Sequence, residues 1–365
     1  MRINNIFHLN FLLIFLVILL SLVGVSALYS AADGSFYPWA IRHFIRFCIL
    51  FIVMILISLI NIKIIFRYAY LFFFACLILL FSVEIIGTFG KGAERWIQIF
   101  GISIQPSEII KVAIILALAK YYHNIKFDNI AYLRHLLFPI FIILLPFFLV
   151  AIQPDLGTSL CIFLLGFLIM FTAGVRIWKF VLGIIVSLAS IPFLWNYFKP
   201  YQQKRLLSFL NPESDPLGQG YQLIQSKIAL GSGGLTGKGF LEGTQSYLEY
   251  LPEKQTDFIF TLIGEEFGFL GTLFVLLLFS LLILVCFYIS IKSHHVFGRI
   301  ISLGVASNLF LYALLNMSMV TGLMPVVGIP LPLISYGGTA MLSIMISFGL
   351  LLNVDIHYSM KKIND

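Results

Sequence analysis

Ten apolar stretches follow one another along the 365-residue chain, and each has about the length of a membrane-crossing helix. Such a helix needs about 20 mainly apolar residues. The stretches are continuous, whereas the strands of a transmembrane β-barrel alternate apolar and polar residues. The pattern therefore predicts an all-α integral membrane protein with about ten transmembrane helices, at residues 10–30, 41–61, 68–88, 104–122, 133–152, 157–174, 178–197, 261–290, 300–322 and 332–354.

One long polar segment, residues 197–260, separates the seventh predicted helix from the eighth. A loop of this length is usually functional or disordered, and its close mixture of aromatic, aliphatic and charged residues favours function. The remaining loops are too short to form a second domain. We therefore expect a single polytopic membrane domain over residues 1–365, with residues 197–260 as its catalytic loop. The first apolar run is longer than a signal-peptide core and is predicted to be an uncleaved anchor.

The composition agrees with a membrane protein and excludes several other classes. Hydrophobic residues make up 60% of the chain and charged residues 11%, and the mean hydropathy is +1.02. The four cysteines all lie in predicted helices without CxxC spacing, so they are interpreted as small core residues. The formal charge of +7 is explained by loop cations that face lipid headgroups, so no nucleic acid partner is expected.

The positions of lysine and arginine predict the orientation of the chain. Short cytoplasmic loops carry more of these residues than outer loops do. Both termini are therefore predicted to be cytoplasmic, and the 197–260 loop extracytoplasmic. The cations on the side of the termini are Arg2, Lys63, Arg67, Lys120, Lys126, Arg134, Arg176, Lys179, Lys292, Arg299, Lys361 and Lys362, against Arg42, Arg46, Lys91 and Arg95 on the other side.

An ionisable pair lies inside the fourth predicted helix. Gln105 and Pro106 are typical of a helix start, which places Glu108 in the first turn and Lys111 three residues further on the same face. Ionisable residues at membrane depth are costly and mark either a functional site or a mutually neutralising structural pair. Both interpretations stay open for this pair, which also could line a catalytic cavity.

Two further predicted helices begin with charged residues on the outer side. Arg42 and Arg46 share one helical face, where they either extend to the membrane interface or bind an anionic headgroup. Asp155 stands at the start of the sixth helix. Its favoured role is a helix cap, and the alternative is a carboxylate that faces the cavity.

The centre of the long loop is glycine-rich, with the sequence GSGGLTGKG at residues 231–239. A Walker A motif fails at Ser232 and Gly239, and a dinucleotide fingerprint fails at Thr236. No nucleotide cofactor is therefore expected. These glycines are expected to permit tight turns, or to let backbone N–H groups approach an anion.

Other parts of the loop have their own patterns. Residues 220–230 have an apolar face and are predicted to form a half-helix at the interface. Gln245, Glu249, Glu253 and Asp257 recur at four-residue steps, although a proline at 252 argues against one continuous helix. Asp257 or the preceding Thr256 could also cap the eighth transmembrane helix.

The last three predicted helices carry polar residues at membrane depth. Glu265 and Glu266 are adjacent near the outer end of the eighth helix, and Asn308 and Asn316 in the ninth can bond neighbouring helices. Two prolines and two adjacent glycines within residues 328–338 break the last helix near its outer end. Irregular backbone at this depth survives only where it is buried or lines a cavity.

Six segments together resemble the SEDS family of bacterial membrane proteins, which serve cell shape, elongation, division and sporulation. They occur in the same order over nearly the whole chain, and the unbroken glycine-rich segment favours the elongation branch. The segments are GKGAERWIQIFGISIQPSEIIK (90–111), AIQPDLGTS (151–159), NPESDPLGQGYQLIQSKIALGSGGLTGKG (211–239), GTQSYLEYLPEKQTDFIF (243–260), GEEFGFLG (264–271) and GIPLPLISYGG (328–338).

The resemblance implies a peptidoglycan glycosyltransferase of the bacterial inner membrane that polymerises lipid II with a class B penicillin-binding protein. It places Asp257 at the family's essential acid, which would act as a general base. Gln255 stands where the family usually has histidine, which removes any titrating imidazole there. The expected substrate-binding residues are Arg42, Trp96, Glu108, Lys111, Asp155, Lys238 and Gln245.

The implied reaction releases a pyrophosphate, which needs positive charge from Arg42, Lys111, loop cations or a divalent cation such as Mg²⁺ or Mn²⁺. Two other functions fit the same architecture. A lipid II flippase would use its charged residues for access from both sides, and a non-catalytic scaffold for a penicillin-binding protein would tolerate loss of the loop's acids.

Overall fold

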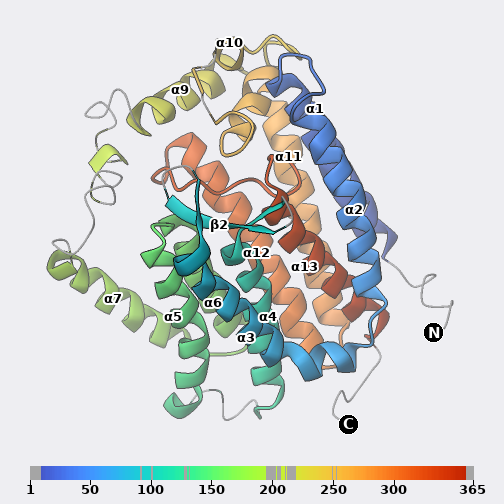
Figure 1. The fold of residues 1–365 in the computed structure, drawn as a ribbon, viewed down its shortest axis with the longest axis vertical. Helices are drawn as coiled ribbons and strands as arrows, with labels where there is room; N and C mark the ends of the chain where they lie inside the picture. Colours follow the sequence, from blue (N-terminus) through green and yellow to red (C-terminus); the bar gives the residue numbers. More distant parts are fainter. Residues whose placement is uncertain are drawn as a thin grey trace.

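Each of the ten apolar stretches forms a helix in the computed structural model (Figure 1). The structure describes residues 10–90, 93–99, 102–126, 130, 132–194, 203, 207–209, 211, 219–248, 250–251 and 253–358. The ten helices are α1 (Phe11–Ala31), α2 (Ala40–Ser58), α3 (Ile62–Ile86), α4 (Pro106–His123), α5 (Leu137–Ile152), α6 (Leu156–Thr172), α7 (Ile177–Leu194), α11 (Ile259–Lys292), α12 (Val296–Thr321) and α13 (Gly338–Ile356).

The lengths and hydropathies of these helices confirm a multi-pass, all-helical membrane protein. Among the described residues, six helices are long and apolar enough to cross a membrane, namely α1, α2, α3, α11, α12 and α13. The apolar parts of α5, α6 and α7 are shorter. Helix α4 carries Glu108 and Lys111 within its first two turns, and it begins at Pro106 as the sequence predicts.

The bundle has two distinct ends. Helix α1 begins and α13 ends at one of them, as an even number of crossings requires (Figure 1). The short helices α9 (Gln219–Ser232) and α10 (Thr244–Tyr247) lie at the opposite end, which we call the loop end. Helix α9 confirms the predicted half-helix. Because α10 ends at Tyr247, the four-residue repeat from 245 to 257 does not form one helix. Several residues of the long loop lie outside the described residues, namely the loop cations Lys199, Lys204 and Arg205, together with Glu249 and the proline at 252.

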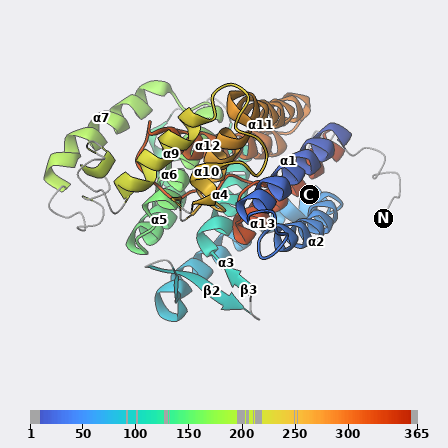
Figure 2. The same ribbon diagram turned by 90° about the horizontal axis from the view of Figure 1, so that it is seen from above.

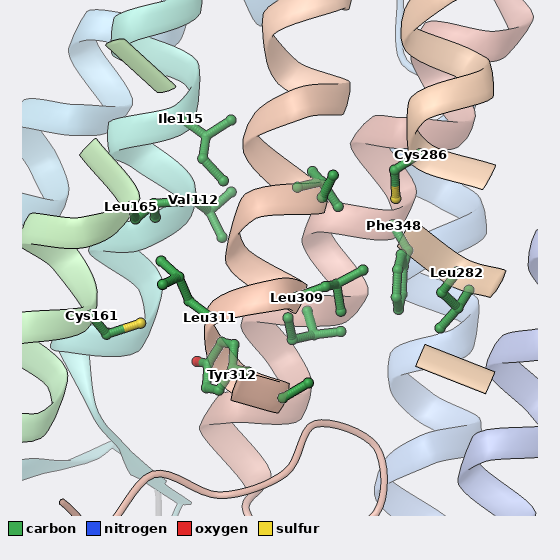
Figure 3. Packing of buried hydrophobic residues seen from close by; sticks show 14 of the residues in the cluster. Val112, Ile115, Cys161, Leu165, Leu282, Cys286, Leu309, Leu311, Tyr312 and Phe348 are labelled. Carbon is green, nitrogen blue, oxygen red and sulfur yellow. The ribbon is translucent and has the colours of Figure 1, made fainter. Parts of the chain in front are cut away.

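Helix α12 is the central element of the core. It packs against α4, α6, α9, α11 and α13, and small residues let its neighbours approach closely. A Cβ at Gly304 would lie 2.7 Å from Cγ2 of Ile115 on α4. Figure 3 shows α12 side chains with those of its neighbours, including the buried free cysteines Cys161 and Cys286. Their burial agrees with their predicted role as core residues.

A small antiparallel sheet between α3 and α4 was not predicted from the sequence. Its strands are β1 (Thr88–Gly90), β2 (Ala93–Ile99) and β3 (Ile102–Ile104), in the order β1-β2-β3. It lies at the edge of the bundle when the molecule is viewed from above (Figure 2). The sequence signal was weak, because polar and apolar residues alternate only over 97–99 and 102–104, although glycines flank the middle strand. A short 3₁₀ turn, Leu133–His135, precedes α5.

The backbone of the glycine-rich loop forms hydrogen bonds with α11 where that helix is broken. Gly268 has φ 65° and ψ −158°, which interrupts the helix. Unpaired backbone groups are costly at membrane depth, and the loop backbone supplies partners on both sides of the break. The four bonds run from Lys238 N to Glu265 O (3.0 Å), Gly239 N to Glu266 O (3.0 Å), Phe269 N to Gly234 O (2.9 Å) and Leu270 N to Leu235 O (3.1 Å). Of the two roles expected for these glycines, the structure shows tight turns, because Gly234, Gly237 and Gly239 all have positive φ. Anion binding by their backbone N–H groups stays a prediction.

Replacing Gly237 with alanine is therefore expected to destabilise the protein strongly. Gly237 has φ +84°, and a Cβ there would lie 2.0 Å from the Glu266 carbonyl oxygen. The left-handed backbone alone costs roughly 1–3 kcal/mol for a residue with a side chain. Gly231→Ala is the matched control, because Gly231 lies in α9 and its Cβ would meet nothing within 4 Å. Thermal unfolding in detergent should separate the two variants, and equal melting temperatures would contradict this account of the loop.

Candidate active site

Asp257 lies in a turn, residues 253–258, directly before α11. The helix is capped by position 258, a phenylalanine with no side-chain cap bond, so Asp257 is not the N-cap residue. The side chain is half-buried. Its Oδ2 lies 3.4 Å from where a Cβ of Gly328 would stand. Among the described residues other than Gly328 and its two chain neighbours, no other atom lies within 4 Å of that point. The carboxylate therefore faces the irregular segment that precedes α13, beside a position that has no side chain.

The backbone of the Asp257 turn is held by donors from that segment and from α12. Three consecutive carbonyl oxygens, at residues 255–257, each accept one hydrogen bond. The donors are Tyr336 N (2.9 Å), Ser335 Oγ (2.6 Å) and Asn316 Nδ2 (2.9 Å), in that order. The irregular backbone predicted around 328–338 thus packs against the turn of the expected catalytic acid.

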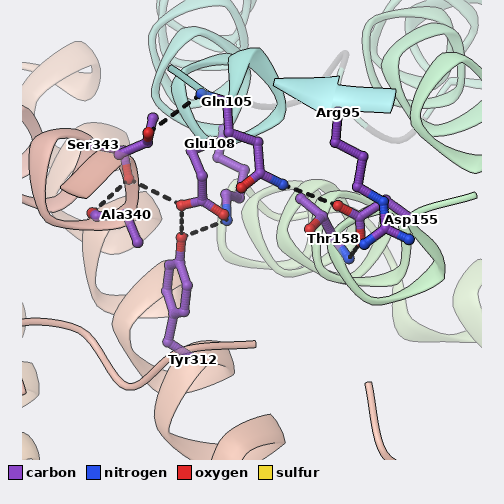
Figure 4. Close-up of polar contacts among 10 residues, drawn as sticks. Arg95, Gln105, Glu108, Asp155, Thr158, Tyr312, Ala340 and Ser343 are labelled. Carbon is purple, nitrogen blue, oxygen red and sulfur yellow. Dashed lines mark hydrogen bonds and ion pairs between the residues drawn. The ribbon is translucent and has the colours of Figure 1, made fainter. Parts of the chain in front are cut away.

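Glu108 and Lys111 form a buried ion pair of 2.7 Å between Oε1 and Nζ. The Lys111 and Glu108 side chains are only 1% and 5% exposed. Tyr312 of α12 accepts a hydrogen bond from Lys111 and donates one to Glu108, and Ser343 of α13 donates to Glu108 at 3.3 Å (Figure 4). Both charges are therefore paired and enclosed by three helices in this conformation. Their predicted role in binding substrate stays a prediction.

Asp155 caps α6, which was its favoured role. Its Oδ1 accepts from Thr158 N at 3.2 Å. Its Oδ2 accepts from Gln105 Nε2 at 3.0 Å, and Arg95 of β2 lies 3.9 Å from Oδ1 (Figure 4). Arg95 also donates to the carbonyl oxygens of residues 153 and 154, at the end of α5. The unpredicted sheet thus supplies the cation beside Asp155.

These polar groups border one region at the loop end. Gln105 N donates to Thr339 Oγ1 at 3.3 Å, which joins the start of α4 to the start of α13. A Cβ at Gly157 would lie 2.4 Å from the Val327 carbonyl oxygen, so α6 touches the segment that leads to Gly328. The Asp155 group and the Asp257 turn therefore lie on two sides of the same irregular segment.

Lys238 and Gln245 both bond Glu265, which lies in α11 beyond the Asp257 turn. Glu265 Oε1 accepts from Lys238 Nζ (2.7 Å) and from Gln245 N (2.9 Å), and the carboxylate is fully buried. The adjacent Glu266 accepts a hydrogen bond from Ser30 of α1. The two predicted substrate-binding residues are thus placed together, in a cluster that joins the loop to α11.

The remaining predicted residues lie on α2 and β2. Arg42 is exposed in the first turn of α2, whereas Arg46 is half-buried with its guanidinium 4.8 Å from the Tyr336 ring centre. Arg46 therefore places a cation against the irregular segment before α13, whose Tyr336 N–H bonds the Asp257 turn. Trp96 is half-buried on β2.

The expected divalent cation has no three-residue protein site among the described residues. No group of three or more His, Cys, Asp or Glu side chains is arranged there to hold a metal ion. The expected Mg²⁺ or Mn²⁺ therefore stays a prediction.

Sequence reasoning missed Tyr312, Ser335, Ser343 and Gln105 as members of these clusters. A signal existed for two of the helices. Asn308, Tyr312 and Asn316 recur at four-residue steps on α12, and Thr339, Ser343 and Ser347 do so on α13, so each set lies on one helical face.

Comparison with known proteins decides the family. A family profile described as “Cell cycle protein”, covering FtsW, RodA and SpoVE, matches residues 3–360. The chain belongs to the FtsW/RodA/SpoVE family. It is 40% identical over 354 residues to “Peptidoglycan glycosyltransferase MrdB” of Escherichia coli K12, covering 94% of this chain and 93% of the relative. It is 37% identical over 357 residues to “Stage V sporulation protein E” of Bacillus subtilis 168, covering 94% and 96%.

Solved structures of this family share the fold. A chain from a structure described as “Structural coordination of polymerization and crosslinking by a peptidoglycan synthase complex” superposes with a TM-score of 0.84 at 28% identity, covering 96% of this chain and 98% of that one. The Thermus thermophilus rod shape determining protein RodA superposes with a TM-score of 0.73 at 26% identity, covering 96% and 98%. The family assignment made from the six sequence segments is confirmed.

Proposed function

We propose that this chain is a peptidoglycan glycosyltransferase that polymerises lipid II into glycan strands, with Asp257 as the general base. The names of its FtsW/RodA/SpoVE relatives support the activity. One structural observation supports the site. The backbone around Asp257 is held by hydrogen bonds to three consecutive carbonyl oxygens, those of residues 255–257. The Asp257 carboxylate faces Gly328, which has no side chain.

This geometry suits the chemistry of chain growth. A sugar 4-hydroxyl attacks an anomeric carbon, the bond from that carbon to the undecaprenyl pyrophosphate breaks, and the hydroxyl loses its proton. A carboxylate beside an open position can accept that proton as the new bond forms. Arg42 and Arg46 share one face of α2, near the end of the helix that lies at the loop end. They are the cations that would approach the leaving pyrophosphate.

The proposed partner is a class B penicillin-binding protein in the same membrane. The structure described above as a peptidoglycan synthase complex couples polymerisation to crosslinking, and its chain covers 96% of this one. A polymerase and a crosslinking enzyme act on the same new strand, which supports a shared complex.

The decisive experiment is polymerisation of purified lipid II by the purified protein, with and without its partner, read as glycan strands on a gel. Strands made by the protein support the proposal. A parallel vesicle assay tests the alternative flippase activity, which needs no glycan product. Lipid II translocation without any polymer in the presence of the partner would exclude the proposed function.

We also propose that the loop end is extracytoplasmic and that both termini are cytoplasmic. The excess of lysine and arginine on the side of the termini supports this orientation. A reporter fused after residue 125 or 294 should report the cytoplasm, and one inserted near residue 215 should report the outside. A cytoplasmic signal at 215 would contradict the site assignment, because lipid II is polymerised outside.

A further inference from the structure

The irregular segment that faces Asp257 is rigidly held. Leu333 has φ +64°, a left-handed conformation that is an outlier for a residue with a branched side chain. Such strain persists only where the surroundings fix it, and it gathers at functional sites. The Leu333 carbonyl oxygen lies 3.0 Å from Nε2 of the buried His43, and a Cβ at Gly24 of α1 would lie 2.5 Å from the same oxygen. Helices α1 and α2 therefore hold the segment from one side.

Ser335 joins this segment to the Asp257 turn through its hydroxyl. The hydroxyl accepts a hydrogen bond from Leu331 N at 2.8 Å and donates one to the Thr256 carbonyl oxygen at 2.6 Å. The side chain is buried. The Ser335 hydroxyl thus links the Leu331 N–H of the irregular segment to the carbonyl oxygen of Thr256, the residue before Asp257.

Asn316 makes a second link from α12. Its Nδ2 carries two N–H donors, and it bonds the carbonyl oxygens of Asp257 (2.9 Å) and Ile329 (2.7 Å). The side chain is fully buried. Ile329 follows Gly328, the residue beside the Asp257 carboxylate. A single amide group therefore fixes both the backbone of the acid and the backbone that the acid faces.

We propose that Asn316 and Ser335 are positioning residues that hold the Asp257 carboxylate at one place beside Gly328, where the acceptor hydroxyl approaches. The inference rests on the proposed function and extends it to two residues outside the acid itself. Reacting groups must be held to within a fraction of an ångström, and a displacement of about 1 Å costs on the order of 100-fold in rate. Neither residue contacts the substrate, so their loss lowers kcat more than it changes KM.

Asn316→Ala tests the first link, with Asn308→Ala as the matched control. Both asparagines are fully buried on α12, but the Asn308 amide has no hydrogen-bond partner in the described part of the chain. We expect Asn316→Ala to lower kcat about 10- to 100-fold with KM within about twofold of native. The control should retain near-native kcat.

Ser335→Ala tests the second link, with Ser226→Ala as its control. Ser226 is also buried. Its hydroxyl donates to the Val320 carbonyl oxygen at 2.8 Å and lies 2.7 Å from Thr261 Oγ1 in α11, so its bonds are to α12 and α11 and not to residues 253–258. Ser335→Thr keeps the hydroxyl and should recover most of the kcat lost in Ser335→Ala. Equal kcat losses in Ser335→Ala and Ser226→Ala at matched thermal stability would overturn the inference.

Hydrogen–deuterium exchange of the peptide spanning residues 253–260 supplies a measurement that needs no activity. Exchange in this peptide should rise in Asn316→Ala and Ser335→Ala and stay native in both controls, because only the first two lose bonds to the turn. Native exchange in all four variants would overturn the inference. A native protein that makes no polymer would instead contradict the proposed function, and the exchange result would still decide whether the two residues hold the turn.

Discussion

Asp257→Asn should give a folded protein that has lost about 10²- to 10⁴-fold of its lipid II polymerisation, the range expected for removal of a general base. Asparagine keeps the size of the side chain and removes its charge and basicity. A loss of helix capping cannot explain such an effect, because α11 is capped by position 258, and asparagine caps about as well as aspartate. Polymer should be measured directly, at matched protein amount and with confirmed partner binding.

The matched control for this variant is Glu253→Gln. Glu253 lies in the same turn, where its Oε2 accepts a hydrogen bond from the Thr256 hydroxyl at 2.7 Å. Glutamine retains an oxygen acceptor, so the turn is expected to stay folded while one carboxylate charge is removed. Its activity should stay within a few fold of native. Near-native polymerisation by Asp257→Asn, or an equal loss in both variants, would contradict the proposed role of Asp257.

Lys111→Ala should destabilise the protein by roughly 3–5 kcal/mol and abolish activity, because it leaves Glu108 charged and unpaired in an enclosed site. The Lys111 side chain is 1% exposed and also bonds Tyr312, so Glu108 loses its countercharge and Tyr312 loses one of its two hydrogen bonds. Lys111→Arg keeps the positive charge and should lose less stability and less activity. Melting temperature in detergent and polymer yield are the two measurements.

A double variant separates the structural role of this pair from a functional one. Glu108→Ala/Lys111→Ala removes both charges, and replacing a buried pair with apolar residues is often close to neutral for stability. A double variant that regains stability without activity supports a role of the pair in catalysis or substrate binding. Recovery of both would show that the pair serves the fold alone. Equal and mild effects of Lys111→Ala and Lys111→Arg would contradict the expected cost of an unpaired Glu108.

The helices could be predicted from the sequence because membrane crossing is a local property. A run of apolar residues of sufficient length has no other stable state in a bilayer, where each backbone group must be paired within its own helix. The start of α4 at Pro106, the cap at Asp155 and the break before Gly338 also depend on neighbouring residues alone, and all three are found. The small sheet was missed because its strands are only 3 to 7 residues long and lie between two strong helical signals.

The contacts of the site depended on residues far apart in the sequence. The sequence identified Asp257 through its motif, but the donors to its turn come from positions 59 to 81 residues further along the chain. Likewise, no local pattern pairs Lys238 with Glu265, or Arg95 with Asp155. Such pairings arise because each buried or membrane-embedded polar group must find a partner, and the packing of the helices decides which partner is within reach.

The sequence by itself therefore determined the class of the protein, its helices, its family and the identity of the expected acid. Only the tertiary structure decided that the glycine-rich loop completes the broken backbone of α11 and that Glu108 and Lys111 are enclosed with Tyr312. It also decided that Asn316 and Ser335 hold the turn of Asp257. The physical reason is range, since hydrophobic runs and helix caps act between near neighbours, whereas hydrogen bonds between segments require the folded packing to bring them together.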